Sequence, residues 1–362
     1  MSGSVAPAFR PAPGETRAVV TGIGIAVPTA ASPADLLAAR SRLGAGQPRA
    51  GAGPDWFDPV SVLGQRGWKY LSPATRFLLG ATARALAAAR LEPGAYEDTQ
   101  LAVAAGTNFA ANPVLARFDA AVLAEGSDAL SPAEAPNFSV NMPASHAAAK
   151  HGMRAFSLTL TNPVVAGLEA LLALTRALGT GRAAAGLAGA TEEMPDVPVR
   201  DDAGEGACAL AVESEKGARE RGAGALAEIA GGFCRFLPHP AETAASTQGS
   251  ARLASALGDP LTALVTAAGR GAQGDPIPFI VCCDDPELAG RLTRYCTERC
   301  AAAGVTLTPV AGYLGGDGAF FSVSPLLQLA GLITEHGHGL VLGTAPHGNL
   351  AAVLLRPARP AA

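Results

Sequence analysis

The sequence predicts an α/β fold built from two similar mixed-sheet halves, stacked in five layers in the order helix, sheet, helix, sheet, helix. Three observations lead to this prediction. From residue 17 onward, β-branched apolar runs alternate with segments of helical periodicity. Each half closes with strands that follow one another without a helix between them, which is typical of antiparallel pairs. The same order of elements is followed twice along the chain, although the two halves share no convincing sequence identity.

The central element of the first half is a strand that turns sharply into a helix, over residues 157–181. Residues 157–161 are apolar or β-branched, and Asn162 and Pro163 suit the N-cap and the first position of the helix. Helically spaced apolar residues and then two terminating glycines follow: Val164, Leu168, Leu171, Leu172, Leu178, Gly179 and Gly181. Such a turn commonly presents a nucleophile at its tip, where N–H groups and the helix dipole favour an anion. The tip here offers Pro163, Val164 and Val165, and none of these is a nucleophile.

The other elements of the first half follow from apolar periodicity and from helix caps. Ser32–Pro33 and Ser72–Pro73 are each a pair of an N-cap and a first-turn proline. In chain order, we expect a buried strand at 17–28, a short helix ending at residue 43, a long alanine-rich helix at 74–90, a strand at 100–106, an amphipathic helix at 113–125, a short strand at 137–142, a helix at 144–151 and, after the central element, a strand at 183–190.

The remaining chain is predicted to begin with two antiparallel strands and then to repeat the alternation of strands and helices. We expect strands at 206–213 and 226–236 around a charged turn at 215–222, a helix at 253–270, a strand at 277–283, a helix at 286–303, a strand or loop at 306–312, a helix at 316–335 and closing strands at 339–343 and 349–355. The predicted division is a flexible tail (1–16), an N-terminal half (17–237), a linker (238–252) and a C-terminal half (253–362).

Composition excludes several classes of function. The chain has 362 residues, 49% of them hydrophobic and 16% charged, and its net charge is −4, so nothing favours binding to nucleic acid or to an anionic membrane. No apolar run reaches the roughly 20 residues that span a bilayer, and the start lacks the apolar core of a signal peptide, so a cytoplasmic location is expected. The six cysteines form no CxxC pair and have no histidine at ligand spacing. We therefore expect neither a metal nor a cofactor.

Several short motifs occur along the chain in an order that is more informative than any one of them. They are VVTGIGIAVP (19–28), GT (106–107), NMPASHAAAKHGMR (141–154), the element at 157–181, GLAGATEEM (186–194), GEGACALAVE (204–213), GYLGGDGA (312–319) and GTAPHGNLAAVLL (343–355). Each motif is weak alone, but in this order and spacing they resemble the β-ketoacyl synthases of the thiolase fold, over about residues 17–356. The resemblance implies a thiolase-like five-layer αβαβα fold.

The departures from the family pattern bear on the activity. The resemblance places Val164 where the family has its acyl-accepting cysteine, and Cys282 and Cys283 in the loop of the first catalytic histidine. Tyr313 stands at the position of the second histidine and Thr308 at that of a lysine. Condensation needs a thiolate to accept the acyl group and histidines to stabilise the enolate, and valine cannot be acylated. The catalytic set is therefore expected to be absent.

Ketosynthase-like chains without the cysteine resemble the chain-length-factor subunit of type II polyketide or aryl-polyene synthases. This resemblance implies a heterodimer with an active ketosynthase, which handles acyl carrier protein through the complex. The dimer interface would then include Met142, Ser157, Leu158, Thr159, Leu160 and Thr161. The side chains that limit the substrate tunnel would be Phe109, Asn112, Val114, Leu115 and Phe118, although ordinary core packing explains these apolar residues equally well.

Two other interpretations stay open at this point. One is a rewired thiolase-fold acyltransferase that uses Cys282, Cys283 or Tyr313, and it predicts a covalent acyl adduct on this chain. The other is a homodimeric scaffold without a role in acyl chemistry. The cysteines at 282 and 283 are more simply explained as small apolar thiols that end a buried strand.

Overall fold

Ten strands form one mixed sheet in the order β3-β2-β4-β5-β1-β6-β10-β9-β7-β8. The computed structural model describes residues 16–44, 56–194, 203–239, 250–267 and 275–359, so most of the expected tail and linker lies outside the described residues. The strands are β1 (Ala18–Ala26), β2 (Leu101–Gly106), β3 (Phe156–Leu160), β4 (Ala185–Glu192), β5 (Gly206–Ser214), β6 (Ala227–Phe236), β7 (Ile277–Cys282), β8 (Leu307–Pro309), β9 (Gly339–Thr344) and β10 (Asn349–Pro357).

The strand order contains the same five-stranded pattern twice. The sequence β3-β2-β4-β5-β1 is matched in reverse by β6-β10-β9-β7-β8, and in each set two of the four pairings between neighbouring strands are parallel and two are antiparallel. A short pairing of β1 with β6 joins the sets, in which Ala18, Val19 and Val20 lie opposite Ile229, Glu228 and Ala227. The predicted α/β fold of two similar mixed-sheet halves is thus confirmed. The strand order groups β6 with the second set, although the sequence-based division keeps it in the first half.

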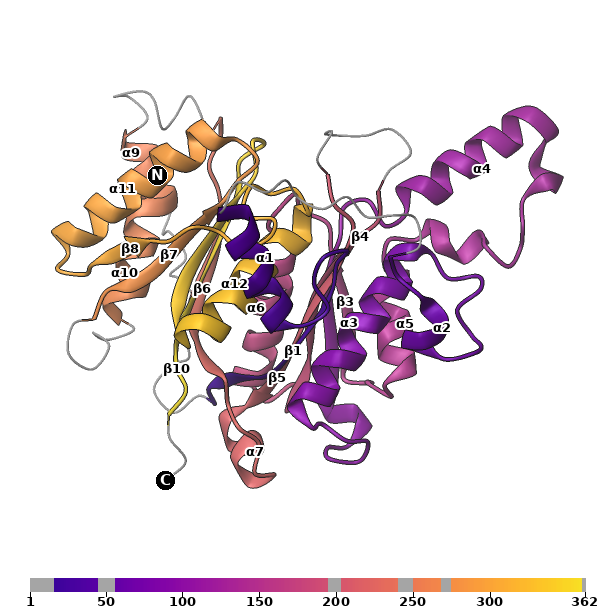
Figure 1. The fold of residues 1–362 in the computed structure, drawn as a ribbon, viewed down its shortest axis with the longest axis horizontal. Coiled ribbons are helices and arrows are strands. Elements are labelled where there is room, and N and C mark those ends of the chain that lie inside the picture. The colour runs from indigo at the N-terminus through magenta and orange to yellow at the C-terminus, as the bar shows by residue number, and fades with distance from the viewer. Residues whose placement is uncertain (1–15, 45–55, 195–202, 240–249, 268–274, 360–362) are drawn as a thin grey trace.

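Helices cover both sets of strands and fill the space between them (Figure 1). The helices α3 (Pro73–Ala89) and α5 (Met142–Lys150) pack on the outer face of the first set, and α10 (Asp259–Ala267) and α11 (Pro286–Ala302) on that of the second. Between the sets lie α6 (Ala166–Gly179) and α12 (Ser324–His336), whose leucines form the largest buried cluster. This arrangement gives the five predicted layers.

The remaining helices and turns lie around these layers. They are α1 (Pro33–Gly44), α2 (Pro59–Leu63), α4 (Asn112–Glu125), α7 (Glu215–Glu220) and α9 (Ser250–Leu253), the 3₁₀ helices Asp98–Gln100, Ser127–Ala129, Ala135–Phe138 and Phe321–Val323, and the π-helical turn Ala254–Gly258. None of the helices in the described ranges is long and apolar enough to cross a bilayer.

Local chemistry explains where the main helices begin and how closely they pack. Ser72 accepts a hydrogen bond from the N–H of Thr75 at the start of α3, and Asp285 accepts from two N–H groups at the start of α11. The helix α3 then lies directly on β1, where a Cβ at Gly24 would stand 1.9 Å from the carbonyl oxygen of Ala81. The glycines of the motif at 19–28 are therefore required by close packing of a helix on a strand.

Several predicted elements differ from the observed ones. The strand predicted at 137–142 is replaced by a 3₁₀ helix at 135–138 that leads into α5, because Pro136 and Pro143 each stand in the first turn of a helix, where their fixed φ suits helical backbone. The charged turn contains α7, and the helix at 253–270 is divided by a π-helical turn. The helix predicted at 316–335 begins only at Ser324, since Gly315 and Gly318 adopt positive φ and form turns before it.

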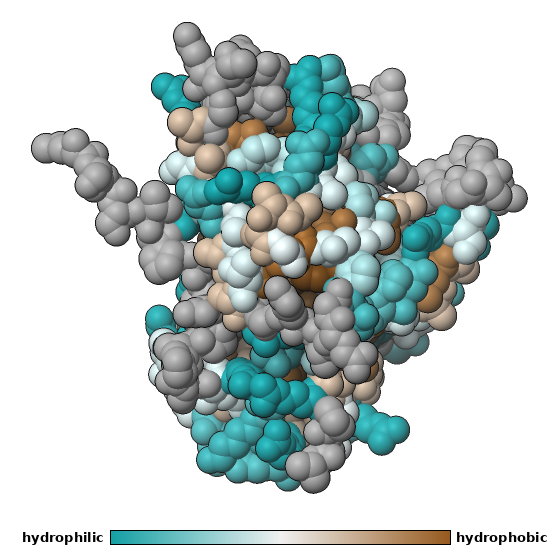
Figure 2. Space-filling model, turned by 90° about the vertical axis from the view of Figure 1, so that its left-hand side faces the viewer, coloured by the Kyte–Doolittle hydropathy of each residue, from teal (hydrophilic) through white to brown (hydrophobic). Residues whose placement is uncertain are grey.

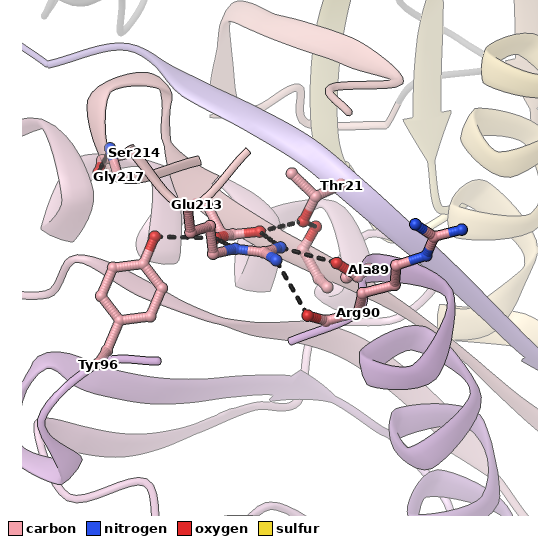
Figure 3. A network of polar contacts seen from close by, with 9 residues as sticks. Thr21, Ala89, Arg90, Tyr96, Glu213, Ser214 and Gly217 are labelled. Atoms are coloured by element: carbon pink, nitrogen blue, oxygen red, sulfur yellow. Dashed lines mark hydrogen bonds and ion pairs between the residues drawn. The ribbon is translucent and has the colours of Figure 1, made fainter. Parts of the chain in front are cut away.

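A buried polar cluster joins α3, α7, β1 and β5 (Figure 3). The fully buried carboxylate of Glu213 accepts hydrogen bonds from Thr21 and from Tyr96 (2.8 Å), and it is paired with the guanidinium of Arg221, whose Nε lies 2.6 Å from Oε2. The same guanidinium donates to the last carbonyls of α3, those of Ala89 (2.8 Å) and Arg90 (3.0 Å). We call these residues the Glu213 cluster. In this cluster one arginine donates to the carbonyl groups at the end of a helix and also pairs with a buried carboxylate.

The edge of the second half is short and apolar. Figure 2 views the molecule from this side and shows apolar surface in the middle of the face, bordered by hydrophilic side chains. Strand β8 pairs with only the first three residues of β7. A hollow of about 450 Å³ lies there, lined by residues that include Phe279, Ile280, Val281, Pro309 and Val310.

Candidate functional site

The strand-to-helix turn after β3 has the backbone of a sharp elbow. Val164 adopts φ +62°, in the left-handed region, which is a genuine outlier for a β-branched residue. The helix α6 starts at Ala166, later than predicted, and Asn162 is not its N-cap. The Asn162 amide instead donates to both carboxylate oxygens of Glu169, at 2.9 and 2.7 Å. The elbow thus holds a strained residue of the kind that concentrates at functional sites.

The side chain at the tip of the elbow is sealed in an apolar contact between the two halves. Val164 is buried against Cys282, at the end of β7, and Ala345, just after β9. Val164 and Cys282, which the resemblance assigns to two catalytic positions of the family, are therefore brought together. The tip carries no group able to attack an acyl donor.

We expect the strain at Val164 to appear in stability measurements. Val164 and Val165 are both buried, but Val165 has an ordinary φ of −86°. Glycine relieves the strain at residue 164 while it removes a similar apolar side chain at both positions. Val164→Gly should therefore cost about 1–3 kcal/mol less free energy of unfolding than Val165→Gly, measured by denaturant titration. Equal losses would show that the left-handed valine stores no strain.

Cys282, which packs against the elbow, and the adjacent Cys283 are both held as neutral thiols. Burial raises the pKa of Cys282 far above its usual value, and its Sγ lies 3.7 Å from the carbonyl oxygen of Gly315. Burial likewise raises the pKa of Cys283 to about 12, and its sulfur accepts the N–H of Asp285 at 3.5 Å. Since the thiolate is the reactive form, neither position has the environment of a nucleophile.

Tyr313 and Thr308 are not part of the elbow site. The Tyr313 hydroxyl donates to the carboxylate of Glu335, and its ring lies 4.8 Å from the Arg40 guanidinium. Glu335 is in the last turn of α12, whereas the first turn of α6 contacts Ser322 and Leu326, at the other end of that helix. The length of α12 between them is about 13 Å, so the phenol lies far from Val164. Thr308 is exposed on the edge strand β8.

A buried carboxylate that the sequence interpretation did not single out lies beside the elbow. Glu192, the last residue of β4, is fully buried and accepts N–H groups from Asn108 (3.0 Å), Phe109 (2.9 Å) and Ser322 (3.3 Å). The hydroxyls of Thr107 and Ser322 also donate to it. Burial raises the pKa of Glu192, and these hydrogen bonds oppose that shift. Glu192 therefore ties the loop after β2 to the second half.

The next residue, Glu193, is a buried carboxyl with a strongly altered affinity for protons. Burial raises the pKa of Glu193 to about 7, although the N–H of Ala74 donates to it at 3.0 Å and Arg117 and Arg76 favour its charged form. The pair of adjacent glutamates in the motif at 186–194 is a signal that sequence reasoning can use, because polar residues at the carboxyl ends of neighbouring parallel strands meet at one sheet edge.

The Glu193 carboxyl should make stability fall as pH rises. The folded chain keeps this proton up to about pH 7, whereas an unfolded glutamate releases it near its usual pKa of 4.5. The folded state thus binds more protons in this window, and wild type should lose about 2 kcal/mol of unfolding free energy between pH 5 and 8 relative to Glu193→Gln. Denaturant titrations of both proteins across this range measure the difference. Parallel pH profiles would contradict the shifted pKa.

The predicted tunnel residues lie in two environments. Val114 is buried, and Phe109 is half-buried with its ring 4.7 Å from that of Phe321. Asn112 and Leu115 are exposed, and Phe118 is half-buried. All of the predicted tunnel residues except Phe109 belong to α4, which extends away from the body of the molecule and buries Val114 near its start (Figure 1). The structure therefore brings Phe109, but not the α4 residues, to the Glu192 loop.

The predicted interface residues lie at the free edge of the first half. Strand β3 pairs with β2 on one side and ends the ten-stranded sheet. Ser157, Leu158 and Thr161 are exposed, and Met142, Thr159 and Leu160 are half-buried. Between residues 115 and 158, the described part of the chain has these large exposed apolar side chains: Leu115, Val122, Leu123, Phe138, Val140 and Leu158.

Comparisons with known proteins agree with this architecture. Residues 50–216 match the family described as beta-ketoacyl synthase, N-terminal domain. No curated protein sequence matches the chain. The resemblance to ketosynthases inferred from the motifs is thus confirmed by a family match over the first half.

Three solved structures share the fold. One is AntDE:AntF, a type II polyketide synthase acyl-carrier protein in complex with its ketosynthase bound to the hexaketide, at 18% identity and a TM-score of 0.76. Another is the ishigamide ketosynthase/chain length factor, at 21% identity and 0.72, and a third is a β-ketoacyl synthase from Burkholderia phymatum STM815, at 14% and 0.68. Each match covers 95% of this chain and 100% of the other. The chain therefore has the thiolase-like fold of the ketosynthases and carries, over residues 50–216, the sequence pattern of the β-ketoacyl synthase N-terminal domain.

Proposed function

We propose that this chain is a non-catalytic, ketosynthase-like chain-length factor, which pairs with an active ketosynthase and shapes the tunnel for its growing acyl chain. One observation carries the proposal: the elbow keeps its strained left-handed backbone at Val164, yet the side chain there is a buried hydrocarbon. The backbone strain persists without the nucleophile that would use it.

The chemistry of condensation favours a non-catalytic role for this chain. Acyl transfer needs a nucleophile that can become an anion, and decarboxylation needs donors that stabilise the enolate. Val164 supplies neither, and the neighbouring Cys282 is a buried thiol with a raised pKa. A rewired acyltransferase would have to use Cys282, Cys283 or Tyr313. The first two are protonated in their buried sites, and the Tyr313 hydroxyl is engaged by Glu335.

The surface of the first half supports pairing with another subunit. The edge of β3 presents the backbone groups and side chains of a strand that has one neighbour, and such edges pair readily with other strands. Further exposed apolar residues lie on α4, where Leu123 is 88% exposed. Large exposed apolar side chains are typical of a surface that a partner covers. In the proposed complex, acyl carrier protein delivers its substrate to the ketosynthase.

Co-expression with a ketosynthase tests the pairing. The candidate partner is the product of a neighbouring reading frame with its cysteine and both histidines in place. We expect a stable complex of one copy of each chain, and low solubility of this chain alone because β3 and α4 are then uncovered. Equal solubility alone and a homodimer that ignores the ketosynthase would instead support the scaffold interpretation.

In the complex, shortening a tunnel side chain should lengthen the product. Phe118→Ala and Leu115→Ala each remove apolar bulk from α4, and the space gained should admit at least one further extender unit. Mass spectrometry of the released products measures the change. Asp119→Ala, an exposed substitution on the same helix, is the control and should leave product length unchanged. Unaltered products from an intact complex would remove the α4 residues from the tunnel.

A further inference from the structure

A charged hollow lies where the two sets of strands join. Its volume is about 450 Å³, and it is bordered by α7 and by the residues that follow β10. Both α7 and the end of β10 lie at the lower end of the molecule in Figure 1. The charged side chains that line the hollow belong to Glu215, Arg219, Glu228 and Arg359. The hollow is therefore distinct from the elbow and from the free edge of β3.

The strand register places a further arginine beside this hollow. Glu228 of β6 lies opposite Val19 of β1 and opposite Arg356 of β10. Directly opposed residues point to the same face of a sheet, and their neighbours along each strand point to the other face. Val19, Glu228 and Arg356 therefore share the outer face, on which Val19 and Glu228 line the hollow. Their neighbours along the strands belong to the central buried cluster: Ala18, Ile229 and Leu355.

The two glutamates that line the hollow already have arginine partners. Arg17 Nε lies 3.8 Å from Oε1 of Glu228, and Arg17 Nη1 lies 4.0 Å from Oε2 of Glu215. Arg219 also pairs with Glu215, at 3.1 Å. Two arginines thus already balance the charge of the two carboxylates.

Arg356 and Arg359 add positive charge that is not paired in the same way. Within the described ranges, neither guanidinium forms an ion pair, and the buried Nε of Arg356 has no hydrogen-bond partner. Burial lowers the pKa of Arg356, and the carboxylate of Glu228 opposes this shift. The positive charges of Arg17 and Arg359 lower the pKa of Arg356 further. Guanidinium groups held close together without a counter-charge attract an anion from solvent.

The geometry points to a binding site for a phosphate monoester, held by the guanidinium groups of Arg356 and Arg359. A guanidinium can donate two parallel N–H groups to a phosphate, and a hollow of this volume accommodates a small organic phosphate. Glu228 lies opposite Arg356 on the same face, so its carboxylate repels the ligand and limits the affinity. This site does not depend on the proposed function.

Titration calorimetry of the full chain with glycerol 3-phosphate, at an ionic strength held constant with chloride, tests the site. We expect saturable binding of one molecule per chain. Arg356→Gln and Arg359→Gln should each weaken the binding at least tenfold, because each removes a guanidinium that contacts the phosphate. Glu228→Gln should strengthen it several-fold, because it removes the competing negative charge. Arg359 is exposed, so its variant should keep the wild-type fold.

A distant arginine provides the matched control. Arg294 is exposed on α11 and does not line the hollow, so Arg294→Gln removes the same charge and should leave the affinity unchanged. The absence of saturable binding to the wild-type chain would overturn the proposal. Wild-type affinity in Arg359→Gln, or an equal loss in Arg294→Gln, would also overturn it, since the binding would then not belong to this hollow.

Discussion

Replacing Arg221 with alanine should lower the free energy of unfolding by about 3–5 kcal/mol, because it leaves a buried charge without its partner. In the Glu213 cluster the guanidinium pairs with a carboxylate that has no exposure to solvent. It also satisfies the carbonyls of Ala89 and Arg90 at the end of α3. The variant therefore loses an ion pair, and the carbonyl groups at the end of α3 lose their hydrogen-bond donor.

A neighbouring arginine provides the control for this prediction. Arg219 pairs with Glu215 at 3.1 Å, four residues away on the exposed surface of α7. Surface pairs of this kind contribute little, so Arg219→Ala should change the unfolding free energy by about 0.5 kcal/mol or less. Denaturant titration of both variants at pH 7 separates the two expectations. Similar small losses from both would mean that the Glu213 cluster does not hold α3 and α7 together.

A charge placed on the free edge of β3 should disrupt the proposed heterodimer. Leu158 is 38% exposed in the middle of β3, and a lysine there would have to bury its charge when a partner strand pairs. We expect Leu158→Lys to weaken binding to the ketosynthase about a hundredfold, which corresponds to loss of a central interface anchor. Titration calorimetry or analytical size exclusion of the two chains measures this change.

A matched position tests whether the loss of affinity is specific to the free edge of β3. Leu226 is 43% exposed and precedes β6, away from β3 in the strand order. Leu226→Lys makes the same chemical change at a similar exposure and should leave the affinity unchanged. Both variants should keep the wild-type circular dichroism spectrum, since neither side chain is in the core. If Leu158→Lys binds as tightly as Leu226→Lys, the ketosynthase does not pair along β3.

Much of the architecture could be predicted because local signals agree with the fold. The serine–proline pair at 72–73 predicts the start of α3, and its cap is formed as expected. The apolar runs at β2, β4, β7 and β9 are almost continuous, which is typical of parallel strands covered on both faces. The order of these runs was sufficient to predict two similar halves.

Other features depend on contacts between distant segments. The central helix was predicted to begin at Pro163, but the left-handed conformation of Val164 delays it to Ala166, and no propensity scale predicts such a conformation for valine. Tyr313 aligns with a catalytic position by resemblance, yet its ring lies against Gly331, where a Cβ would stand 2.3 Å from it. The glycine provides the space that directs the phenol to Glu335. Such pairings become visible only in three dimensions.

The Glu192 site could be predicted only in part. Two adjacent glutamates at the end of a buried strand are an unusual pattern, and this pattern could have been recognised. The partners of Glu192 come from the loop after β2 and from the turn before α12, which are far apart in the sequence. The position of the carboxylate was therefore predictable from the strand, but its role in joining the halves was not.

Intact-protein mass spectrometry of the complex tests most directly whether this chain supports another subunit's chemistry. After incubation with an acyl-carrier-protein thioester, we expect the acyl mass on the ketosynthase alone and an unchanged mass for this chain. A ketosynthase whose cysteine is replaced by alanine should then leave both masses unchanged. An acyl adduct on this chain, mapped to Cys282, Cys283 or Tyr313, would contradict the account and establish an enzyme with a displaced nucleophile.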